Sequence, residues 1–174
     1  MTHLTKIALL VGALAVSACT NAGRFGQDDP RLDGSAGAGA GAGFVPGGAG
    51  DPSSPAYFQQ AIGDRVLFLV DQSSLTAEAQ ATLDQQAEWL LTNSDYQAVI
   101  EGHADEQGTR EYNLALGGRR ANAVREYLIS RGVPASRLRF VSYGKERPIE
   151  ICSDESCYAK NRRAVTVIAG SAVS

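Results

Sequence analysis

The sequence predicts an α/β sandwich, in which two long helices lie on one face of a β-sheet. Two long segments, residues 76–93 and 109–131, carry apolar side chains at helical spacing. Shorter apolar segments of the strand type surround them, in the order strand, helix, strand, helix, strand, strand. Helices that join strands running in one direction lie on the same face of the sheet, because such crossovers are right-handed.

The first strand is predicted at Arg65–Val70, whose sequence RVLFLV is apolar at every position after the arginine. A continuous apolar run is typical of a strand that is buried on both faces. One or two helical turns precede this strand, within Tyr57–Ile62, and the polar residues Asp71–Ser74 form a turn after it.

The first long helix is predicted to begin after Thr76, because a threonine at this position can cap the free N–H groups of the first turn. Glu78 lies in that turn and interacts favourably with the helix dipole. The helix ends near Asn93, and the second strand follows at Tyr96–Gly102. One apolar stripe of the helix packs on the sheet, and it consists of Ala79, Leu83, Ala87, Leu90 and Leu91.

The second long helix is predicted to begin at Thr109 or Arg110 and to end at Gly132. The last two strands are predicted at Leu138–Tyr143 and Ala164–Ala169. These elements complete the sandwich, but the sequence alone does not give the order of the strands in the sheet.

Two polar residues of the second helix fall on its buried side. At about 100° per residue, Asn113 and Arg120 lie inside the apolar arc, whereas Arg119 lies on the side that faces water. A buried charge must be paired, because an unpaired one costs several kcal/mol. Arg120 therefore needs either an internal acid or a charged ligand, and Arg119 needs neither.

Residues 1–18 have the pattern of a secretory signal peptide, with one lysine, an apolar stretch and two small residues before Cys19. The segment Val16–Cys19, VSAC, resembles the lipobox of bacterial lipoproteins, with Val where Leu is more common. This resemblance implies cleavage before Cys19 and lipid on that residue; the alternative is ordinary signal cleavage beside an incidental cysteine. Thr20 follows instead of Asp, which favours the outer membrane over the inner one.

Residues 19–55 form a predicted flexible linker, and the globular domain is predicted at 56–174. The linker is rich in Gly, Ala and Pro and includes the sequence GSAGAGAGAGF. Such a segment buries too little apolar surface to offset the entropy that is lost when it is ordered. We therefore expect this segment to be a flexible tether between a membrane anchor and a folded domain.

Composition and charge exclude several classes of protein. The formal charge of the chain is −3, and loss of residues 1–18 removes one lysine and no acid, which gives −4. A chain of this mild acidity has no basic surface for nucleic acid. No apolar run reaches the roughly eighteen residues of a membrane span, and no motif for a cofactor is present.

Cys152 and Cys157 flank a polar loop, and in an oxidising periplasm they are expected to form a disulfide. A zinc site is the alternative, but a structural zinc needs four ligands, and His103 is the one histidine after residue 18. His103 with Asp105 could mimic an acid–base pair, yet at a strand end a structural hydrogen bond is expected for this histidine. No catalytic residue and no metal ligand are therefore assigned.

The segment Gly102–Val124, GHADEQGTREYNLALGGRRANAV, joins the second strand to the second long helix. It resembles the signature of the OmpA-like peptidoglycan-binding domains, and the resemblance covers residues 55–170. Within that family, SYGKERP at 142–148 and AKNRRAV at 159–165 resemble the peptidoglycan-associated lipoproteins of the Tol–Pal system. The fold that the resemblance implies is a mixed four-stranded sheet with helices on one side.

The resemblance implies non-covalent binding of the meso-diaminopimelate in the peptidoglycan stem peptide, without catalysis. The free end of this ligand carries an ammonium beside a carboxylate. Asp105 is expected to accept from the ammonium, and Arg120 is expected to grip the carboxylate with two N–H groups. The candidate ligand-binding residues are Asp71, Asp105, Asn113, Arg120 and Arg162.

Two of these positions differ in how well the family pattern supports them. Arg162 belongs to an Asn-Arg-Arg segment that lies near the ligand pocket in the family. Relatives often read Phe-Asp-Phe-Asp before the first turn, and here Asp71 matches the second acid whereas Leu69 replaces the first.

The partners that the resemblance implies are peptidoglycan, the TolB propeller and other periplasmic Tol proteins, with the outer membrane reached through the lipid. One alternative is a cell-wall tether of the same family without a Tol partner. A second alternative is a murein-processing enzyme that uses His103 and Asp105.

Overall fold

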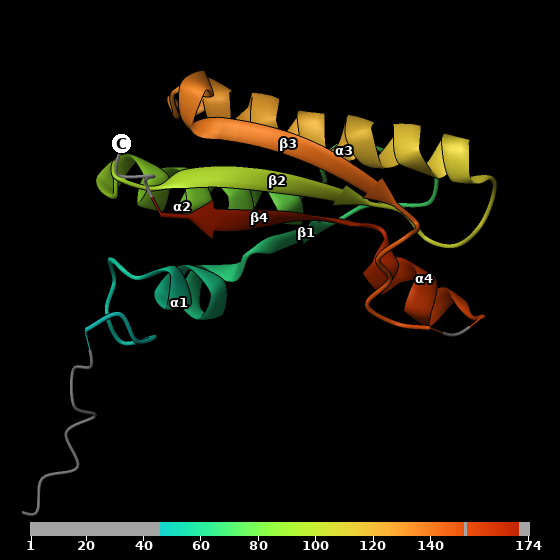
Figure 1. Cartoon of the computed structure of the whole chain (residues 1–174), viewed down its shortest axis with the longest axis horizontal. Helices are drawn as coiled ribbons and strands as arrows, with labels where there is room; N and C mark the ends of the chain where they lie inside the picture. Colours follow the sequence, from blue (N-terminus) through green and yellow to red (C-terminus); the bar gives the residue numbers. More distant parts are fainter. Residues whose placement is uncertain (1–45, 152, 171–174) are drawn as a thin grey trace, which may run out of the picture. The chain divides into compact units, whose positions relative to one another are not determined.

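The computed structural model describes residues 46–151 and 153–170 (Figure 1). The predicted signal peptide, Cys19, most of the predicted linker and Cys152 lie outside these residues. No helix in the described ranges is both long enough and apolar enough to span a membrane.

The sheet has four strands in the order β1–β4–β2–β3. They are β1 (Arg65–Leu67), β2 (Gln97–His103), β3 (Leu138–Gly144) and β4 (Arg163–Ala169). Strand β4 is antiparallel to both of its neighbours, whereas β2 and β3 are parallel. The mixed four-stranded sheet that the family resemblance implied is therefore confirmed.

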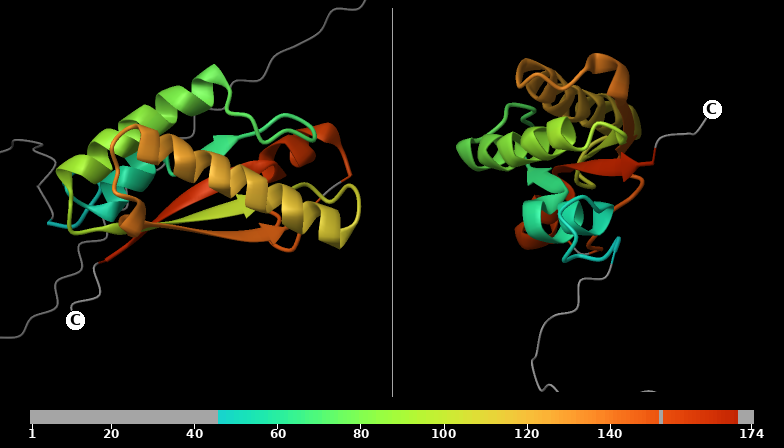
Figure 2. Two further views of the ribbon diagram at one scale, coloured as in Figure 1. Left: turned by 90° about the horizontal axis from the view of Figure 1, so that it is seen from above. Right: turned by 90° about the vertical axis from the view of Figure 1, so that its left-hand side faces the viewer.

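Two long helices, α2 (Ala77–Thr92) and α3 (Arg110–Ser130), lie over the same face of the sheet, as Figure 2 shows. The predicted cap of α2 is confirmed, since the side chain of Thr76 accepts a hydrogen bond from the backbone N–H of Ala79. Helix α3 begins at Arg110, one of the two predicted positions, and the side chain of Thr109 caps it by accepting from the backbone N–H of Tyr112. These bonds satisfy N–H groups that have no partner inside the helix.

The core lies between the sheet and these two helices. Its most deeply buried large aliphatic side chains are each at most 1% exposed, and they are Leu83, Leu90, Ile100, Val124, Leu128 and Val133. Burial of one such side chain contributes about 1.5–3 kcal/mol. This shared core fixes α3 above β2, so the loop that joins them has a defined position.

The backbones of β2 and α3 touch at two glycines. A Cβ atom on Gly102 would lie 1.9 Å from the carbonyl oxygen of Gly117, which is far inside van der Waals contact. Neither position can hold a larger side chain without separating the helix from the strand.

Strand β1 is shorter than the predicted Arg65–Val70. It ends at Leu67, and Leu69 and Val70 are 56% and 50% exposed. The prediction that this run is buried on both faces is therefore wrong. The chain leaves the sheet because the carbonyl oxygens of Leu69 and Gln72 accept hydrogen bonds from Arg120 instead of from a neighbouring strand.

The short helical segment before β1 is confirmed as α1 (Pro55–Tyr57), which continues into the π-helical turn η1 (Phe58–Gly63). The ring of Phe58 packs on the indole of Trp89, with ring centroids 5.0 Å apart. The indole N–H of Trp89 also donates to the carbonyl of Pro52 at 2.6 Å. The folded part therefore begins before Ala56, the predicted boundary.

Two short helices were not predicted: η2 (Ala135–Arg137) before β3 and α4 (Glu155–Asn161) before β4. The expected polar loop between the cysteines is thus partly helical, because the side chain of Asp154 caps α4. Cys157 is buried in α4 and disulfide-bonded. Its predicted partner, Cys152, lies outside the described residues, so that pairing stays a prediction.

Candidate functional site

The candidate site lies at the end of the sheet where β2 ends, α3 begins and α4 packs nearby (Figure 1). Three segments meet here: the loop after β1, the loop between β2 and α3, and α4 with the residue that follows it. Hydrogen bonds between their side chains and backbone bring together all five predicted residues, which come from positions far apart in the sequence: Asp71, Asp105, Asn113, Arg120 and Arg162.

Asp105 is the buried acid of the site, with 7% of the residue exposed. One carboxylate oxygen accepts from the backbone N–H of Gln107 at 3.3 Å, and the other accepts from Nη1 of Arg162 at 3.1 Å. A buried carboxylate is stable only with such partners. Asp105 is thus held in one orientation by the backbone of its own loop, at Gln107, and by Arg162, the residue that follows α4.

Arg162 directly follows α4 and is 4% exposed. Its Nε donates to the carbonyl of Phe68 at 3.3 Å, and its terminal nitrogens donate to Asp105 and Glu155. Burial disfavours its charge, but the hydrogen bonds to Glu155 and Asp105 outweigh that cost and raise the pKa of Arg162.

Arg120 is fully buried, as its position on the helix predicted, whereas Arg119 is exposed. Its three nitrogens donate to three backbone carbonyls, with Nε to Gln72 at 2.8 Å, Nη1 to His103 at 2.9 Å and Nη2 to Leu69 at 3.1 Å. The guanidinium therefore ties the loop after β1 to the end of β2.

No carboxylate in the described ranges forms an ion pair with Arg120, so the internal acid that its burial called for is not in contact. Burial lowers the pKa of Arg120 to about 10, although the charge of Asp105 acts in the opposite direction. An arginine has five N–H groups, so one N–H on each terminal nitrogen is left over. The predicted grip on a ligand carboxylate stays a prediction, with at most these two groups to make it.

Asn113 lies one turn into α3 and is 1% exposed. Its amide nitrogen donates to the carbonyl of Gln107 at 2.7 Å. Its amide oxygen is buried and has no hydrogen-bond partner in the part of the chain that the structure describes. The backbone of Gln107 is thus bonded to both side chains: its N–H donates to Asp105, and its carbonyl accepts from Asn113. The amide oxygen of Asn113 is left as an unused acceptor.

Asp71 lies at the rim of the site, in the loop that Arg120 holds. Its φ of 55° is in the left-handed region, which is uncommon for a residue with a side chain. Its carboxylate accepts from the hydroxyl of Tyr112 at 3.2 Å. Strained conformations of this kind occur at binding sites that the surrounding structure holds in place.

Sequence reasoning missed Glu155, which contacts Arg162, and the structural role of Asn161. The amide of Asn161 accepts from the backbone N–H groups of Ile149 and Glu150 and donates to the side chain of Glu106 at 3.1 Å. Asn161 was visible only as part of the Asn-Arg-Arg segment. Glu155 gave no signal, because its helix was taken for a loop.

His103 was expected to make a structural hydrogen bond through its ring, and this is wrong. The ring is 1% exposed, and neither nitrogen has a hydrogen-bond partner among the described residues. The closest acid is Glu101, with its carboxylate 3.7 Å from Nε2. Burial, and then the charges of Arg163 and Arg147, lower the pKa of His103 to about 4.

Because the pKa of His103 is lower in the folded than in the unfolded chain, the domain should lose stability as the pH falls from 6.5 towards 4. We expect the free energy of unfolding to be roughly 1–2 kcal/mol lower at pH 5 than at pH 7 because of this residue. Urea unfolding at both pH values measures this difference. A His103→Gln variant should show a smaller difference, and an equal one would contradict the assignment.

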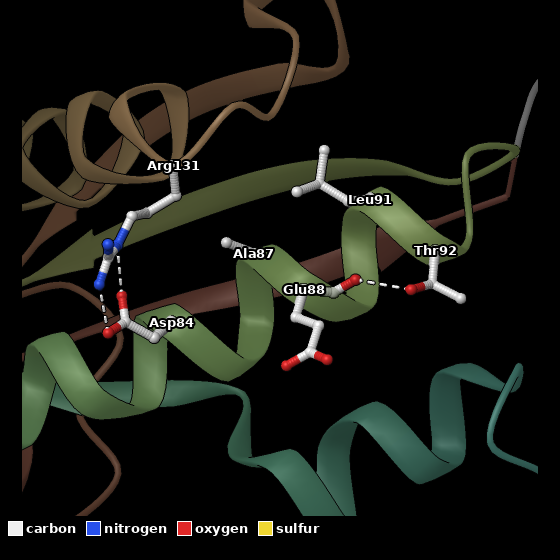
Figure 3. A pocket seen from close by; sticks show the side chains of 6 residues that line it. All are labelled: Asp84, Ala87, Glu88, Leu91, Thr92 and Arg131. Carbon is white, nitrogen blue, oxygen red and sulfur yellow. Dashed lines mark hydrogen bonds and ion pairs between the residues drawn. The ribbon is translucent and has the colours of Figure 1, made fainter.

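A separate hollow of about 530 Å³ lies along α2 (Figure 3) and contains none of the predicted site residues. It is lined by Asp84, Ala87, Glu88, Leu91, Thr92 and Arg131. Asp84 accepts hydrogen bonds from Arg131 and from the hydroxyl of Tyr127, and the bond from Arg131 is the main reason that the pKa of Asp84 is lowered. These contacts clamp α2 to α3 and form an open groove rather than a second site.

Residues 46–151 and 153–170 contain no group of three or more His, Cys, Asp or Glu side chains that could hold a metal ion. The chemistry that the site can perform is recognition of charge. The site contains two buried cations, one buried carboxylate and, linked to that carboxylate through Gln107, an asparagine whose amide oxygen is unused among the described residues. Such a set suits a small ligand that carries both an ammonium and a carboxylate.

Comparison with known proteins places this arrangement in context. Residues 67–162 match the model of the OmpA family. The chain is similar to the peptidoglycan-associated lipoprotein of Rhizobium meliloti (strain 1021), with 52% identity over 161 residues that cover 92% of this chain and 85% of the relative. It is also similar to the protein of the same name from Mesorhizobium japonicum, with 57% identity over 71% of this chain and 73% of the relative.

Solved structures agree with these sequence matches. The crystal structure of the peptidoglycan-associated lipoprotein from Burkholderia pseudomallei has a TM-score of 0.62 and 41% identity, and the match covers 68% of this chain and 97% of that one. The C-terminal domain of Helicobacter pylori MotB has a TM-score of 0.58 at 22% identity, over 63% of this chain and 86% of that one, which shows a shared fold.

Proposed function

Because the chain belongs to the OmpA family, and within it to the peptidoglycan-associated lipoproteins, we propose that it binds peptidoglycan without covalent chemistry. The ligand group is the free end of meso-diaminopimelate in the stem peptide. The observation that carries this proposal is Arg120, a fully buried cation that has no carboxylate in contact in the described structure. A ligand carboxylate would supply the missing counter-charge.

The other end of the zwitterion has acceptors in the same site. Asp105 offers a carboxylate, and Asn113 offers the buried amide oxygen that has no partner in the described residues. An ammonium between them would satisfy both acceptors. Arg162 lies beside Asp105 and adds positive charge for the ligand carboxylate, while Asp71 shapes the rim.

Co-sedimentation with purified sacculi tests the proposal. The wild-type chain is expected to pellet with sacculi whose stem peptides contain meso-diaminopimelate, and free meso-diaminopimelate should compete. Nα-acetyl-L-lysine methylamide has the side-chain ammonium but no carboxylate, so it should compete much less. Equal competition by both compounds would refute recognition of the zwitterionic end.

Binding without catalysis is supported by the state of the two residues that could form an acid–base pair. The ring of His103 is buried and has no hydrogen-bond partner among described residues, whereas Asp105 is engaged by Gln107 and Arg162. In the described part of the chain, no hydrogen bond joins Asp105 to the ring of His103. Incubation with sacculi should therefore release no soluble fragments.

The anchor and the partners complete the proposal. Lipid on Cys19 and the Gly-rich segment after it would hold the domain to the periplasmic face of the outer membrane on a flexible tether. We expect TolB and other Tol proteins to be partners during envelope constriction at cell division, since SYGKERP and AKNRRAV resemble the lipoproteins of that system. Co-purification of TolB with the membrane-extracted chain tests this part.

A further inference from the structure

Arg162 is shared between two carboxylates that differ strongly in exposure. The side chain of Asp105 is 10% exposed and approaches Nη1 from inside the site, whereas the side chain of Glu155 is 67% exposed. Glu155 contacts both terminal nitrogens of Arg162 with its two carboxylate oxygens. This two-point contact is the geometry in which an arginine binds the carboxylate of a ligand.

The position of Glu155 makes the contact easy to break. It is the first residue of α4, and the helix is capped by Asp154 rather than by this side chain. Among the described residues, its side chain forms hydrogen bonds with Arg162 alone, and most of the side chain is in water. Arg162 is buried, but water and salt reach the carboxylate of Glu155 and screen the contact from that side.

We propose that Glu155 occupies Arg162 in the free protein in place of the ligand carboxylate and thereby sets the affinity of the site. This inference rests on the proposed function and deepens it. Asp105 keeps its hold on Arg162 when the ligand enters, and the ligand carboxylate replaces Glu155 on the outer side of the guanidinium. The apparent affinity is then the intrinsic affinity multiplied by the fraction of molecules in which Glu155 does not cover Arg162.

Titration calorimetry with free meso-diaminopimelate tests the inference on the full chain. A Glu155→Gln variant keeps the shape but loses the charge, so its affinity should rise roughly three- to tenfold. The matched control is Glu150→Gln, which removes an acid that pairs with Lys160 instead of Arg162 and should leave the affinity unchanged.

A second variant, Glu155→Asp, tests whether a change in binding comes from the contact with Arg162 or from loss of folding. Glu155→Asp keeps the charge but shortens the side chain, so it should also tighten binding, by a smaller factor, while circular dichroism stays that of the wild type. Unchanged or weaker binding by both folded variants would overturn the role of Glu155 while leaving the proposed function intact. If the wild type itself does not bind meso-diaminopimelate, the proposed function and this inference both fall.

Discussion

Replacement of Gly102 by alanine is expected to destabilise the domain strongly. The added Cβ would lie 1.9 Å from the backbone oxygen of Gly117 and 2.6 Å from its carbonyl carbon, so no side-chain rotation can relieve the clash. Helix α3 would have to move away from β2, and overpacking of this kind costs about 3 kcal/mol or more. Since a domain of this size is stable by only about 5–15 kcal/mol, urea unfolding should detect the loss directly.

The chain offers a matched control one residue beyond the contact. A Cβ on Gly118 would meet the Cβ of Ser142 at 3.9 Å, which is an ordinary contact distance. Gly118→Ala lies inside α3 and should stabilise the domain by roughly 0.5–1 kcal/mol, because alanine loses less conformational freedom on folding. A Gly102→Ala variant as stable as Gly118→Ala would contradict the backbone contact described above.

Asp105→Asn is expected to weaken sacculus binding by roughly 100-fold or more, since a charge-assisted hydrogen bond to the ligand ammonium is lost in a buried site. Asparagine keeps the shape of the side chain and can still accept from the backbone N–H of Gln107. The domain should therefore unfold cooperatively, at a somewhat lower denaturant concentration. Co-sedimentation with sacculi measures the binding, and circular dichroism measures the fold.

Two substitutions serve as controls for this result. Asp95→Asn removes one negative charge from an exposed position, and Arg119→Ala removes the exposed neighbour of Arg120. Both should bind sacculi like the wild type. Normal binding by folded Asp105→Asn would end the assignment of this acid to the ligand.

Arg120 itself is a poorer probe than its place in the family motif suggests. Its side chain donates to the carbonyls of Leu69, Gln72 and His103, so Arg120→Ala would leave three acceptors without their partner. Loss of binding in that variant would combine a missing contact with a loosened loop. We therefore expect Arg120→Ala to lower the stability of the domain as well as its binding.

The sequence predicted the elements whose causes are local. The cap at Thr76 and most of the apolar stripe of α2 lie within one helix, so they can be read without knowledge of the fold. Leu91 is the exception, because it is 47% exposed and its predicted burial against the sheet is wrong. The burial of Arg120 followed from the same helical spacing. What failed depended on distant partners: β1 ends early because Arg120 binds the loop after it, about fifty positions away in the chain.

The site was predictable in its members but not in its contacts. Asp105 and Arg162 came from the family motif, whereas their ion pair joins residues 57 positions apart and no local pattern encodes it. Glu155 was missed for a related reason. Its helix is short and lies in a polar stretch, so no apolar periodicity marks it in the sequence.

The position of the first described residues relative to the candidate site has a mechanical consequence. In Figure 1, α1 and the first described residues lie at one end of the sheet, and the candidate site lies at the other. A tether on the first end and a cell wall on the second would pull along the strands. The hydrogen bonds between β1 and β4 run across that direction, flanked by those from Thr166 to Asp64 and from Phe68 to Arg162. They would share a tensile load and break together in shear, rather than open one by one.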